Sequence, residues 1–377
     1  MDFEFTDEQE QLRDAVRRWV DKGFGFERRF ALAKAGGKTR AVLGELNQLG
    51  LAGLAVPEAH GGLGFGAVEA MVVMEELGRG LVNAPYAQAA LIAPTLLSGA
   101  PAALQSAWLP KIAGGDALLV LAQQERASRY HLNQVATRAD ESGGGWHLNG
   151  TKIVVPAGDE ADAFIVSARV SGTEDEASGI ALFLVERDAD GVSLRGYPTQ
   201  DGARAVDLLL VEAPAQLISR QGHAALEHGV DVGIAALCAE AVGLMDKMVA
   251  ITVDYMHQRK QFGVAIASFQ ALRHRIADVK MQLELGRSMS YFASLKLGQA
   301  AAQRRRALSQ AKVQLGQSMR FVGQQCTQIH GGIGVTDEYL SSHYFKRLTV
   351  IEMSFGDTLH HLGEASMRMQ DGAGVFA

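Results

Sequence analysis

The hydrophobic pattern of this chain changes its period twice, and that change limits the possible folds more than any other feature. Up to residue 117, apolar residues such as Val16 and Val20 recur at helical spacing. Short apolar runs separated by Gly, Asp and Ser follow, which is typical of short strands, and the helical period then returns. The sequence therefore predicts a mainly α protein with a β-domain: an N-terminal helical domain (1–117), a middle β-barrel-like domain (118–222) and a C-terminal four-helix bundle (223–377).

Within the β-domain, the segment GWHLNGTKIVV carries the strongest turn signal. Apolar and polar residues alternate around Asn149-Gly150, and this dipeptide favours a two-residue hairpin turn because both of its residues tolerate positive φ. We therefore expect two short strands that meet at Asn149-Gly150, followed by further short strands up to residue 222.

The composition excludes several classes of protein. With 47% hydrophobic and 21% charged residues over 377 positions, the chain can bury a sizeable core. Its net charge of −6 argues against a nucleic-acid partner, and no apolar run approaches the ~18 residues that cross a membrane. The two cysteines, Cys238 and Cys326, exclude a disulfide framework and indicate a cytoplasmic protein.

The C-terminal helical part contains the stretch RKQFGVAIASFQ, which places an arginine, an aromatic ring and a carboxamide close together. Arg259 offers a planar fork of donors suited to phosphate oxygens, Phe262 offers a ring face, and Gln270 adds the carboxamide. Taken alone, the pattern also fits a basic helix end followed by a core phenylalanine, since cations favour helix C-termini.

A second stretch, QIHGGIGVTDEY, lies further along the chain. Gly331 and Gly332 allow the backbone to approach a ligand closely because they lack Cβ, and Gln328 precedes them. The stretch lacks the Gly-Lys-Ser/Thr ending of a nucleotide P-loop. A single Gly-Gly-x-Gly is usually only a turn, so this stretch needs support from the rest of the chain.

That support comes from four further stretches, each a weaker signal, that occur along the chain in this order: PEAHGGLG, EELGRG, WLPKIAGGD and LNGTKIVV. With the two stretches above, they resemble the acyl-CoA dehydrogenase family over essentially the whole chain. The resemblance implies a flavoprotein oxidoreductase that uses FAD to dehydrogenate an acyl-CoA thioester, in fatty-acid or steroid side-chain catabolism. It also implies electron-transfer flavoprotein as the electron acceptor.

Two further stretches, YFKRL and FGDTLHHL, are more similar to one branch of this family. That branch includes the small subunits of pimeloyl-CoA dehydrogenase and of related heteromeric enzymes. The implied partner is therefore a homologous acyl-CoA dehydrogenase subunit or a second copy of this chain, in a dimer or tetramer.

The resemblance also implies which residues of the helical part hold FAD. In the family, the arginine, phenylalanine and glutamine of the first stretch reach the cofactor of a neighbouring subunit. The glycine stretch lets the backbone approach the FAD diphosphate, and an aspartate near the C-terminus lies by the ribose or ribityl oxygens. The residues so implied are Arg259, Phe262, Gln270, Gln328, Gly331, Gly332 and Asp357.

In the middle domain, the family covers the flavin ring with the segment that here reads LAQQERASRY. Gln124 matches the family pattern in position and Ser128 matches it within one residue, so both are implied cofactor contacts. Arg126 replaces the usual proline. Pro156 stands where the family has a threonine that bonds the flavin, and proline has neither a hydroxyl nor an N–H. These departures indicate a non-standard flavin environment.

The general base is missing from both of its usual positions. The family reaction needs a carboxylate to remove the α-proton of the thioester, but Phe355 occupies one base position and Gly233 the other. Glu240, two helical turns beyond Gly233, can serve a displaced substrate, or it is a bundle carboxylate satisfied by an arginine or a backbone N–H. Asp357 is interpreted first as a cofactor contact. The explanation that we favour is a homologous partner chain that supplies the complete active site.

Asp357 and His361 are four residues apart, a helical spacing that can chelate a metal. A flavin dehydrogenase needs no metal, so we predict none. The leading hypothesis is FAD-dependent α,β-dehydrogenation of an acyl-CoA thioester by one subunit of a heteromeric enzyme. The alternative is a non-catalytic scaffold subunit that completes a partner's FAD site, and a flavin oxidase or monooxygenase is a third hypothesis.

Overall fold

The computed structural model describes residues 5–369. By their internal contacts these residues form two compact units, each assembled from segments that are distant in the sequence. The division at residues 117 and 222 stays a prediction. The first unit contains residues 5–30, 67–82 and 234–369, and the second contains residues 31–66 and 83–233.

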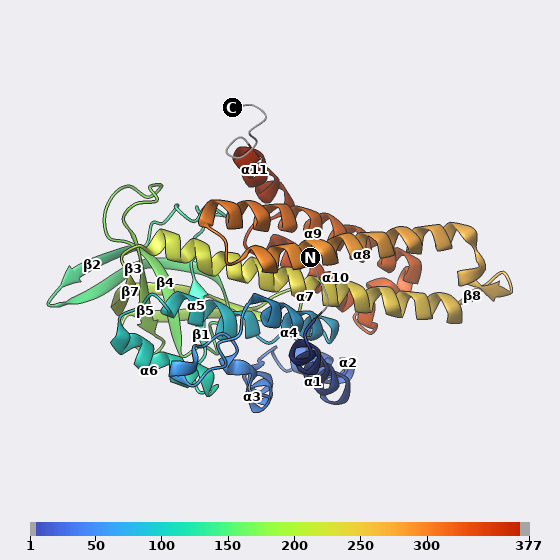
Figure 1. Ribbon diagram of the computed structural model, residues 1–377, viewed down its shortest axis with the longest axis horizontal. Coiled ribbons are helices and arrows are strands. Elements are labelled where there is room, and N and C mark those ends of the chain that lie inside the picture. The colour runs from blue at the N-terminus through green and yellow to red at the C-terminus, as the bar shows by residue number, and fades with distance from the viewer. Residues whose placement is uncertain (1–4, 370–377) are drawn as a thin grey trace. The chain divides into compact units, whose positions relative to one another are not determined.

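The second unit is built on a seven-stranded sheet that closes on itself (green in Figure 1). The strands β4, β2, β3, β7 and β5 pair in this order, and β5 pairs back to β4, which makes the ring of a small barrel. Buried apolar side chains such as Phe164, Phe183 and Val206 form its core. The strands are β1 (Leu119–Ala122), β2 (Arg138–Ser142), β3 (Gly145–Pro156), β4 (Ala163–Arg169), β5 (Ile180–Glu186), β6 (Val192–Pro198) and β7 (Arg204–Ser219).

The predicted hairpin turn at Asn149-Gly150 is wrong. Strand β3 runs through this dipeptide, and the two-residue turn lies at Gly143-Gly144, where φ is 62° and 84°. Positive φ at both positions is what a tight hairpin turn needs, and glycine adopts it without strain. Gly150 is required for another reason, because a Cβ there would lie 2.5 Å from Thr137 Oγ1 on the neighbouring segment.

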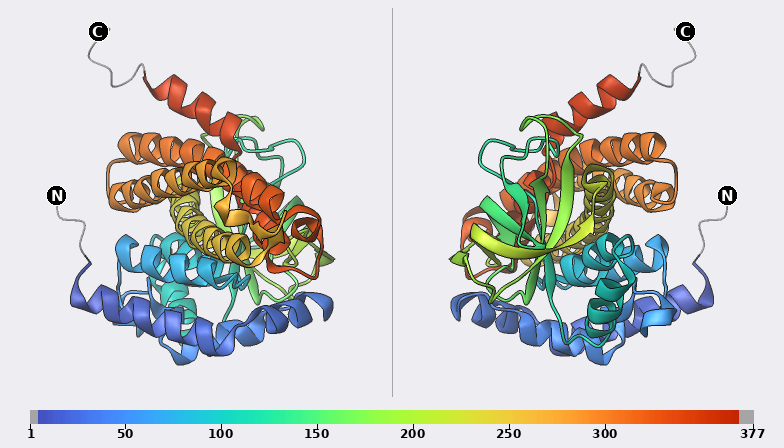
Figure 2. Two further views of the ribbon diagram at one scale, coloured as in Figure 1. Left: turned by 90° about the vertical axis from the view of Figure 1, so that its right-hand side faces the viewer. Right: turned by 90° about the vertical axis from the view of Figure 1, so that its left-hand side faces the viewer.

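The first unit is helical. Helices α8 and α9 form an antiparallel pair joined by residues 297–300, and α10 and α11 pack on α9 (Figures 1 and 2). Helical segments before and after a β-domain confirm the predicted fold class. The helices of the whole chain are α1 (Asp7–Gly23), α2 (Phe26–Lys34), α3 (Arg40–Gln48), α4 (Ala67–Arg79), α5 (Ala93–Leu97), α6 (Ala102–Ala113), α7 (Gly222–Gln258), α8 (Gln270–Lys296), α9 (Ala301–His330), α10 (Leu340–Met353) and α11 (Thr358–Met369). No helix between residues 5 and 369 is both long and apolar enough to cross a membrane.

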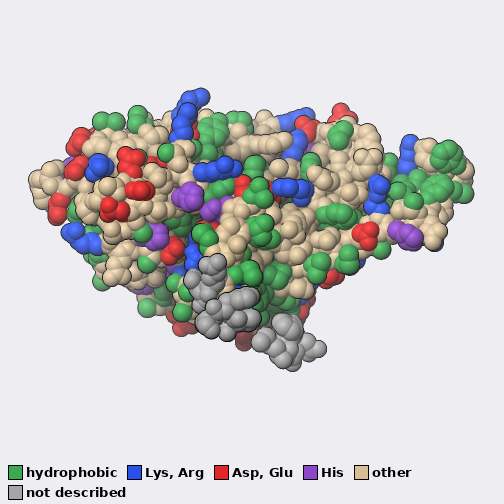
Figure 3. All heavy atoms as spheres, turned by 90° about the horizontal axis from the view of Figure 1, so that it is seen from above, with side chains coloured by type: hydrophobic (Ala, Val, Ile, Leu, Met, Phe, Trp, Pro, Cys, Tyr) green, Lys and Arg blue, Asp and Glu red, His purple; other side chains and the backbone are tan. Residues whose placement is uncertain are grey.

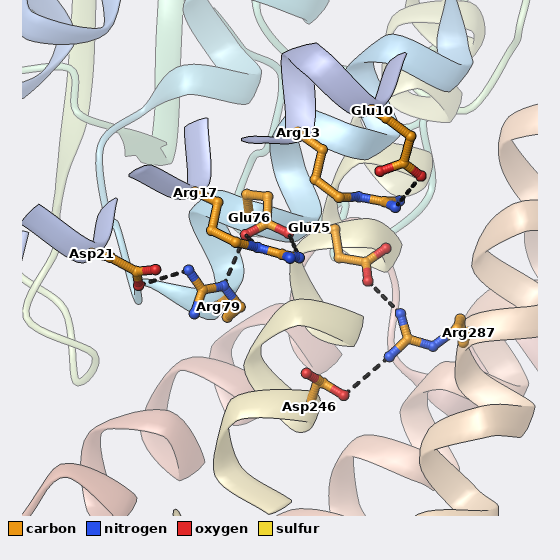
Figure 4. Close-up of polar contacts among 9 residues, drawn as sticks. All are labelled: Glu10, Arg13, Arg17, Asp21, Glu75, Glu76, Arg79, Asp246 and Arg287. Carbon is orange, nitrogen blue, oxygen red and sulfur yellow. Dashed lines mark hydrogen bonds and ion pairs between the residues drawn. The ribbon is translucent and has the colours of Figure 1, made fainter. Parts of the chain in front are cut away.

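Two adjacent carboxylates tie α4 to other helices of the first unit (Figure 4). Glu76 is buried and accepts two hydrogen bonds from the guanidinium of Arg17 on α1. Glu75 accepts from Arg287 on α8, and Arg287 also donates to Asp246 on α7 (3.1 Å). Burial raises the pKa of Glu75, and the charge of Arg287 opposes that rise. Because each buried carboxylate has a cation from another helix, the desolvation of both is compensated.

Helices α4 and α7 also approach each other backbone to backbone. A Cβ on Gly78 would lie 2.1 Å from the carbonyl oxygen of Glu240, and a Cβ on Gly243 would lie 1.8 Å from that of Glu75. These distances are too short for any side-chain carbon, so packing at this crossing requires glycine on both helices.

Candidate active site

A hairpin after α7 carries the first group of predicted cofactor residues. Its strands β8 (Lys260–Gln261) and β9 (Val264–Ala265) pair antiparallel, and the exposed Arg259 precedes them. Phe262 lies in the turn with a φ of 54°, and 91% of its surface is exposed. Figure 3 shows hydrophobic and cationic side chains together at the hairpin end of the molecule. Left-handed backbone and an exposed aromatic ring both cost free energy, so this hairpin is arranged to offer its ring to another molecule.

The glycine stretch lies beside this hairpin, in the same unit. Helix α9 ends at His330, whose backbone carbonyl accepts a hydrogen bond from Tyr255 Oη (3.2 Å). The rings of these two residues have centroids 4.6 Å apart. Met256, Ile266 and Ile329 form a small buried cluster that joins the two stretches. The structure therefore brings together two motifs that are far apart in the sequence.

The glycines of this stretch are open to their surroundings. Gly331 has a φ of 64°, and a Cβ on either Gly331 or Gly332 would meet no atom of the described chain within 4 Å. Gln328, on the last turn of α9, and Gln270, at the start of α8, are both exposed. Packing within residues 5–369 thus does not explain glycine at position 332, whereas close approach of a ligand to the backbone would.

In the second unit, a buried ion pair organises the segment after β1. Lys152 of β3 is fully buried, and its Nζ donates to Glu125 Oε1 (2.6 Å) and to Ser167 Oγ (3.1 Å). Glu125 also accepts from the Thr137 hydroxyl (2.6 Å) and the Ala136 amide (2.7 Å). Burial raises the pKa of Glu125, but Lys152 and these hydrogen bonds outweigh burial and hold the pKa below its usual value. The Glu125 carboxylate is therefore buried in its charged form, and both of its oxygens accept hydrogen bonds.

The two implied flavin contacts of this segment differ in their surroundings. The hydroxyl of Ser128 is buried, accepts from the Glu125 amide (2.9 Å) and donates to the Glu125 carbonyl (2.9 Å), so it closes its own turn. Gln124 is half-buried, and its carbonyl accepts from the Ile153 amide (2.8 Å). Pro156, the residue in place of the family's threonine, is exposed at the end of β3. Gln124 is the better exposed of the two implied contacts.

The loop between α10 and α11 contains Phe355, which the resemblance places at the base position of the family. Phe355 is half-buried and has a φ of 55°, which is uncommon for a residue other than glycine. Gly356 has a φ of 113°, and a Cβ there would lie 2.5 Å from His361 Nε2. His361 Nε2 donates to the Phe355 carbonyl (3.0 Å), and its Nδ1 faces Ser309 Oγ (3.4 Å). Burial lowers the pKa of His361 to about 3, so the ring is neutral with its proton on Nε2.

A buried lysine holds the end of α10 next to this loop. Lys312 Nζ donates to the carbonyl oxygens of Ile351 (2.6 Å) and Glu352 (3.1 Å). Burial lowers the pKa of Lys312 to about 8. The Glu352 side chain accepts from the Thr358 amide (3.1 Å) and hydroxyl (2.7 Å), which fixes the start of α11. The loop is therefore held at both of its ends.

The candidate carboxylates near the base positions both have partners. Asp357 Oδ1 accepts from the His360 amide (2.8 Å) in the first turn of α11, as a helix N-cap does. Glu240 is buried and accepts from Arg347 at 2.6 and 2.8 Å, whereas Gly233 lies buried earlier on α7. Both oxygens of this buried carboxylate are thus engaged by one guanidinium, as a buried charge requires. This geometry favours the structural interpretation of Glu240.

The remaining metal-binding and redox candidates lie apart from one another. Among residues 5–369, no group of three or more His, Cys, Asp or Glu side chains is arranged to hold a metal ion. Cys238 and Cys326 are buried free thiols, and burial raises the pKa of each to about 11. Thiols that stay protonated at neutral pH are poor nucleophiles, so both pack as small apolar groups.

Three protein-family models match consecutive parts of the chain. The N-terminal, middle and C-terminal domains of acyl-CoA dehydrogenase match residues 6–116, 121–212 and 220–369. The chain belongs to the acyl-CoA dehydrogenase family. The family is an oxidoreductase family that acts on CH–CH groups with FAD as its cofactor, so the predicted family, enzyme class and cofactor are confirmed.

Similar proteins match this acyl-CoA dehydrogenase over nearly its whole length. The short/branched chain specific acyl-CoA dehydrogenase of Bos taurus mitochondria is 27% identical over 356 residues, which cover 91% of this chain and 81% of the relative. Among solved structures, the Tcur3481-Tcur3483 steroid ACAD is 29% identical with a TM-score of 0.87, covering 97% of this chain and 99% of that one. The ChsE4-ChsE5 complex from Mycobacterium tuberculosis is 25% identical with a TM-score of 0.90, covering 98% and 99%.

The hairpin and glycine stretch of this acyl-CoA dehydrogenase offer groups that fit FAD. Arg259 provides guanidinium donors for a pyrophosphate, and the exposed ring of Phe262 provides a face for an adenine. The exposed amides of Gln270 and Gln328 can donate to and accept from sugar or phosphate groups. The open backbone at Gly332 leaves room for the diphosphate to approach.

Two residues that hold the site were missed in the sequence, although each carried a signal. Lys152 lies four residues after the buried Leu148 on an alternating strand, so the period of two places it on the buried face. Lys312 lies four residues after Leu308 and three before Leu315, which places it in the apolar stripe of α9. A lysine at a core position of either period predicts a buried cation with a specific partner.

Proposed function

We propose that this acyl-CoA dehydrogenase is one subunit of a heteromeric enzyme and that its homologous partner chain supplies the general base. One observation carries the proposal: Phe355, which the resemblance places at the base position, lies in a loop that is fixed from both sides. The other acidic candidate, Glu240, is bonded to Arg347 through both carboxylate oxygens.

The proposed reaction removes two hydrogens from neighbouring carbons of an acyl-CoA thioester. A carboxylate of the partner takes the α-proton, and the electron pair of that C–H bond forms the new double bond as the β-hydrogen leaves with its own electron pair. FAD would supply the acceptor for that hydride, and electron-transfer flavoprotein is the proposed final electron acceptor. The products are an α,β-unsaturated acyl-CoA, a protonated base and reduced cofactor.

In this scheme the residues of this chain bind and orient the cofactor. Arg259 would donate to the pyrophosphate and Phe262 would contact the adenine. Gln328 and the glycine stretch would hold the diphosphate. The hairpin carries these groups outward, since Phe262 is 91% exposed. This exposure supports a role at the cofactor of an adjoining subunit, so a site formed from two chains is proposed.

The names of two similar assemblies agree with a pair of unlike chains. The Tcur3481-Tcur3483 steroid ACAD and the ChsE4-ChsE5 complex each carry two component names. We propose the same organisation here, in the cytoplasm. The acyl group is an aliphatic, dicarboxylic, branched or steroid-derived one that the shape of the shared pocket selects.

Co-purification with a homologous chain that carries the base glutamate tests this proposal. Flavin absorbance per chain and reduction of an artificial electron acceptor are measured for each chain and for the pair. We expect flavin and turnover in the pair and no turnover by the isolated chain. Turnover by the isolated chain at the rate of the pair, or a pair without flavin, would contradict the proposal.

The scaffold hypothesis differs in one measurable respect. If this chain takes part in an acyl-CoA site of its own, Phe355→Glu supplies the missing carboxylate and restores turnover to a pair whose partner has lost its base. Phe355→Gln is the matched control, because it has nearly the same shape and cannot accept the proton. If flavin is bound and Phe355→Glu remains as inactive as Phe355→Gln, the chain is a scaffold that completes its partner's site.

A further inference from the structure

Strand β3 contains a bulge directly after the buried lysine. On β7, Leu208 pairs with Lys152 and Val206 pairs with Val155, so Ile153 and Val154 together stand opposite one residue. Such a bulge breaks the ladder and turns a side chain out of the regular alternation. Here it exposes 44% of the Val154 side chain.

The backbone of the bulge is strained. Val154 has a φ of 53°, a left-handed conformation that a β-branched residue rarely adopts. Backbone of this kind persists where surrounding contacts determine it, and it concentrates at functional sites. The contacts that hold Val154 therefore indicate what the bulge is for.

A tyrosine of the neighbouring strand β6 supplies the contact at the strained residue. The Val154 amide donates to Tyr197 Oη (3.2 Å), and Tyr197 Oη donates to Asp207 Oδ1 (3.0 Å). Asp207 is the residue of β7 that stands opposite the bulge. Burial, together with the bond to Asp207, raises the pKa of Tyr197, so the phenol keeps the proton that it donates.

The other side of the bulge is tied to the segment that is implied to cover the flavin ring. The Ile153 amide donates to the Gln124 carbonyl (2.8 Å), and Lys152 forms its ion pair with Glu125. The bulge is thus fixed on one side to residues 124–125 and on the other to Tyr197. The amide of Val154 is engaged by the tyrosine and is withheld from other acceptors.

We infer that Tyr197 is a positioning residue for the flavin-facing surface of the middle domain. Through the Val154 amide it fixes the bulge that presents Val154 and Pro156, and it keeps that amide from donating to the flavin. This role rests on the proposed function and on the resemblance, which implies that the segment of Gln124 and Ser128 and the position of Pro156 lie at the flavin ring. Tyr197 holds this surface in place and touches neither substrate nor cofactor.

Tyr197→Phe tests the role because it removes one hydroxyl and keeps the ring. The variant frees the Val154 amide, and a new donor beside a flavin changes the flavin's electronic properties. We expect a shift of the visible flavin absorption and of the midpoint potential, and a roughly 5-fold rise in the Kd for FAD, the fold-change of one hydrogen bond. The protein is the full chain, together with its partner chain if the pair holds the flavin.

Tyr86→Phe is the matched control within the same unit. It removes a buried hydroxyl that donates to the Leu51 carbonyl (2.8 Å), so it lowers the Tm and leaves the flavin spectrum unchanged. A second variant, Val154→Gly, removes the strain that Tyr197 maintains. In that background Tyr197→Phe has a smaller effect on the Kd, because the two residues act through one contact.

The possible results distinguish a failure of the positioning role of Tyr197 from a failure of the proposed function. If wild-type protein holds flavin and Tyr197→Phe changes only the Tm, as Tyr86→Phe does, the positioning role is overturned and the proposed function stands. If neither the wild-type chain nor its pair with the partner binds flavin, both the proposed function and the positioning role of Tyr197 are overturned. A shifted spectrum in Tyr197→Phe alone supports both.

Discussion

Two loops of this protein, one in each unit, are held by fully buried lysines that meet different partners. Lys152 donates to the carboxylate of Glu125 in the β-domain. Lys312 donates to two backbone carbonyls at the end of α10, and no carboxylate of the described residues lies within ion-pair distance of its Nζ. Carbonyls at a helix C-terminus carry only partial negative charge. The first lysine is therefore compensated by a full charge, and the second is compensated in part.

The comparison extends to the backbone beside each lysine. Val154 follows Lys152 closely and has a φ of 53°, whereas Phe355 lies in the loop next to Lys312 and has a φ of 55°. The bulge of β3 and the loop after α10 thus each combine a buried cation with one strained residue other than glycine. The difference teaches that strained backbone can be fixed beside a buried ion pair or beside a buried cation at a helix end.

The largest expected effect comes from breaking the ion pair. Lys152→Met leaves the Glu125 carboxylate buried without its cation, and we expect the free energy of unfolding to fall by about 3–5 kcal/mol. Urea unfolding of the full chain measures it. Lys280→Met is the control, because Lys280 forms an exposed pair with Glu284 (2.7 Å) that is worth less than about 0.5 kcal/mol. Equal losses in the two variants would show that burial of the pair has no energetic importance.

A change in the second loop tests whether it is as closely packed as the first. Gly356→Ala forces a Cβ toward His361 Nε2 at a φ of 113°, so we expect a loss of roughly 2–4 kcal/mol. Gly363→Ala on α11 is the control, since a Cβ there meets no atom of residues 5–369 within 4 Å. It should stabilise the helix by about 0.5–1 kcal/mol. A neutral Gly356→Ala would mean that the loop is free to rearrange.

The pH dependence of stability tests the buried position of Lys312. The pKa of Lys312 is about 8 in the folded protein and near its ordinary, higher value in the unfolded chain, so the unfolded chain binds more protons above pH 7. Stability therefore rises with pH, and between pH 7 and 9 Lys312 contributes an increase of roughly 1–1.5 kcal/mol. Urea unfolding at both pH values measures it. Lys312→Met should remove that increase, and a variant with the slope of the wild type would contradict the assignment.

The smallest expected effect is at the strained valine. Val154→Gly relieves a left-handed conformation but adds freedom to the unfolded chain, so stability should stay within about 1 kcal/mol of the wild type. Its neighbour Val155 is buried in regular strand backbone, and Val155→Gly should cost about 3 kcal/mol. Thermal unfolding of both variants and of the wild type measures these changes in stability. A large loss in Val154→Gly would show that its side chain, rather than its backbone, holds the loop.

The sequence predicted the fold class because helical and alternating periods report directly on which face of an element is buried. Through a resemblance to a family, it also predicted that the hairpin of Phe262 and the stretch of Gly331 contact FAD. The structure brings these two stretches together, and their contact with the cofactor stays a prediction. It failed at Asn149-Gly150, where a turn-forming dipeptide lies inside a strand. Close approach to Thr137 selects Gly150, and a contact between distant segments leaves no local signal.

The strained residues could not be read from the sequence either. Val154 is left-handed because β3 and β7 change register beside it, and that register depends on the pairing of the whole sheet. An arginine or a backbone N–H was expected to satisfy Glu240. The structure shows an arginine, Arg347, which could not be named from the sequence. The crossing of the helices decides which cation pairs with which carboxylate. The hydrophobic period of the sequence does not predict that pairing.

The crossing of α4 and α7 limits which substitutions this sequence can accept during evolution. Gly78 and Gly243 each face a backbone carbonyl of the opposite helix, so a methyl group at either position would clash with that carbonyl. No second change on the partner helix can compensate, because a carbonyl is common to all twenty residues. In a library of random variants these two positions should tolerate no replacement, while the helices around them diverge freely. Two such glycines give a simple marker for recognising remote descendants of this fold.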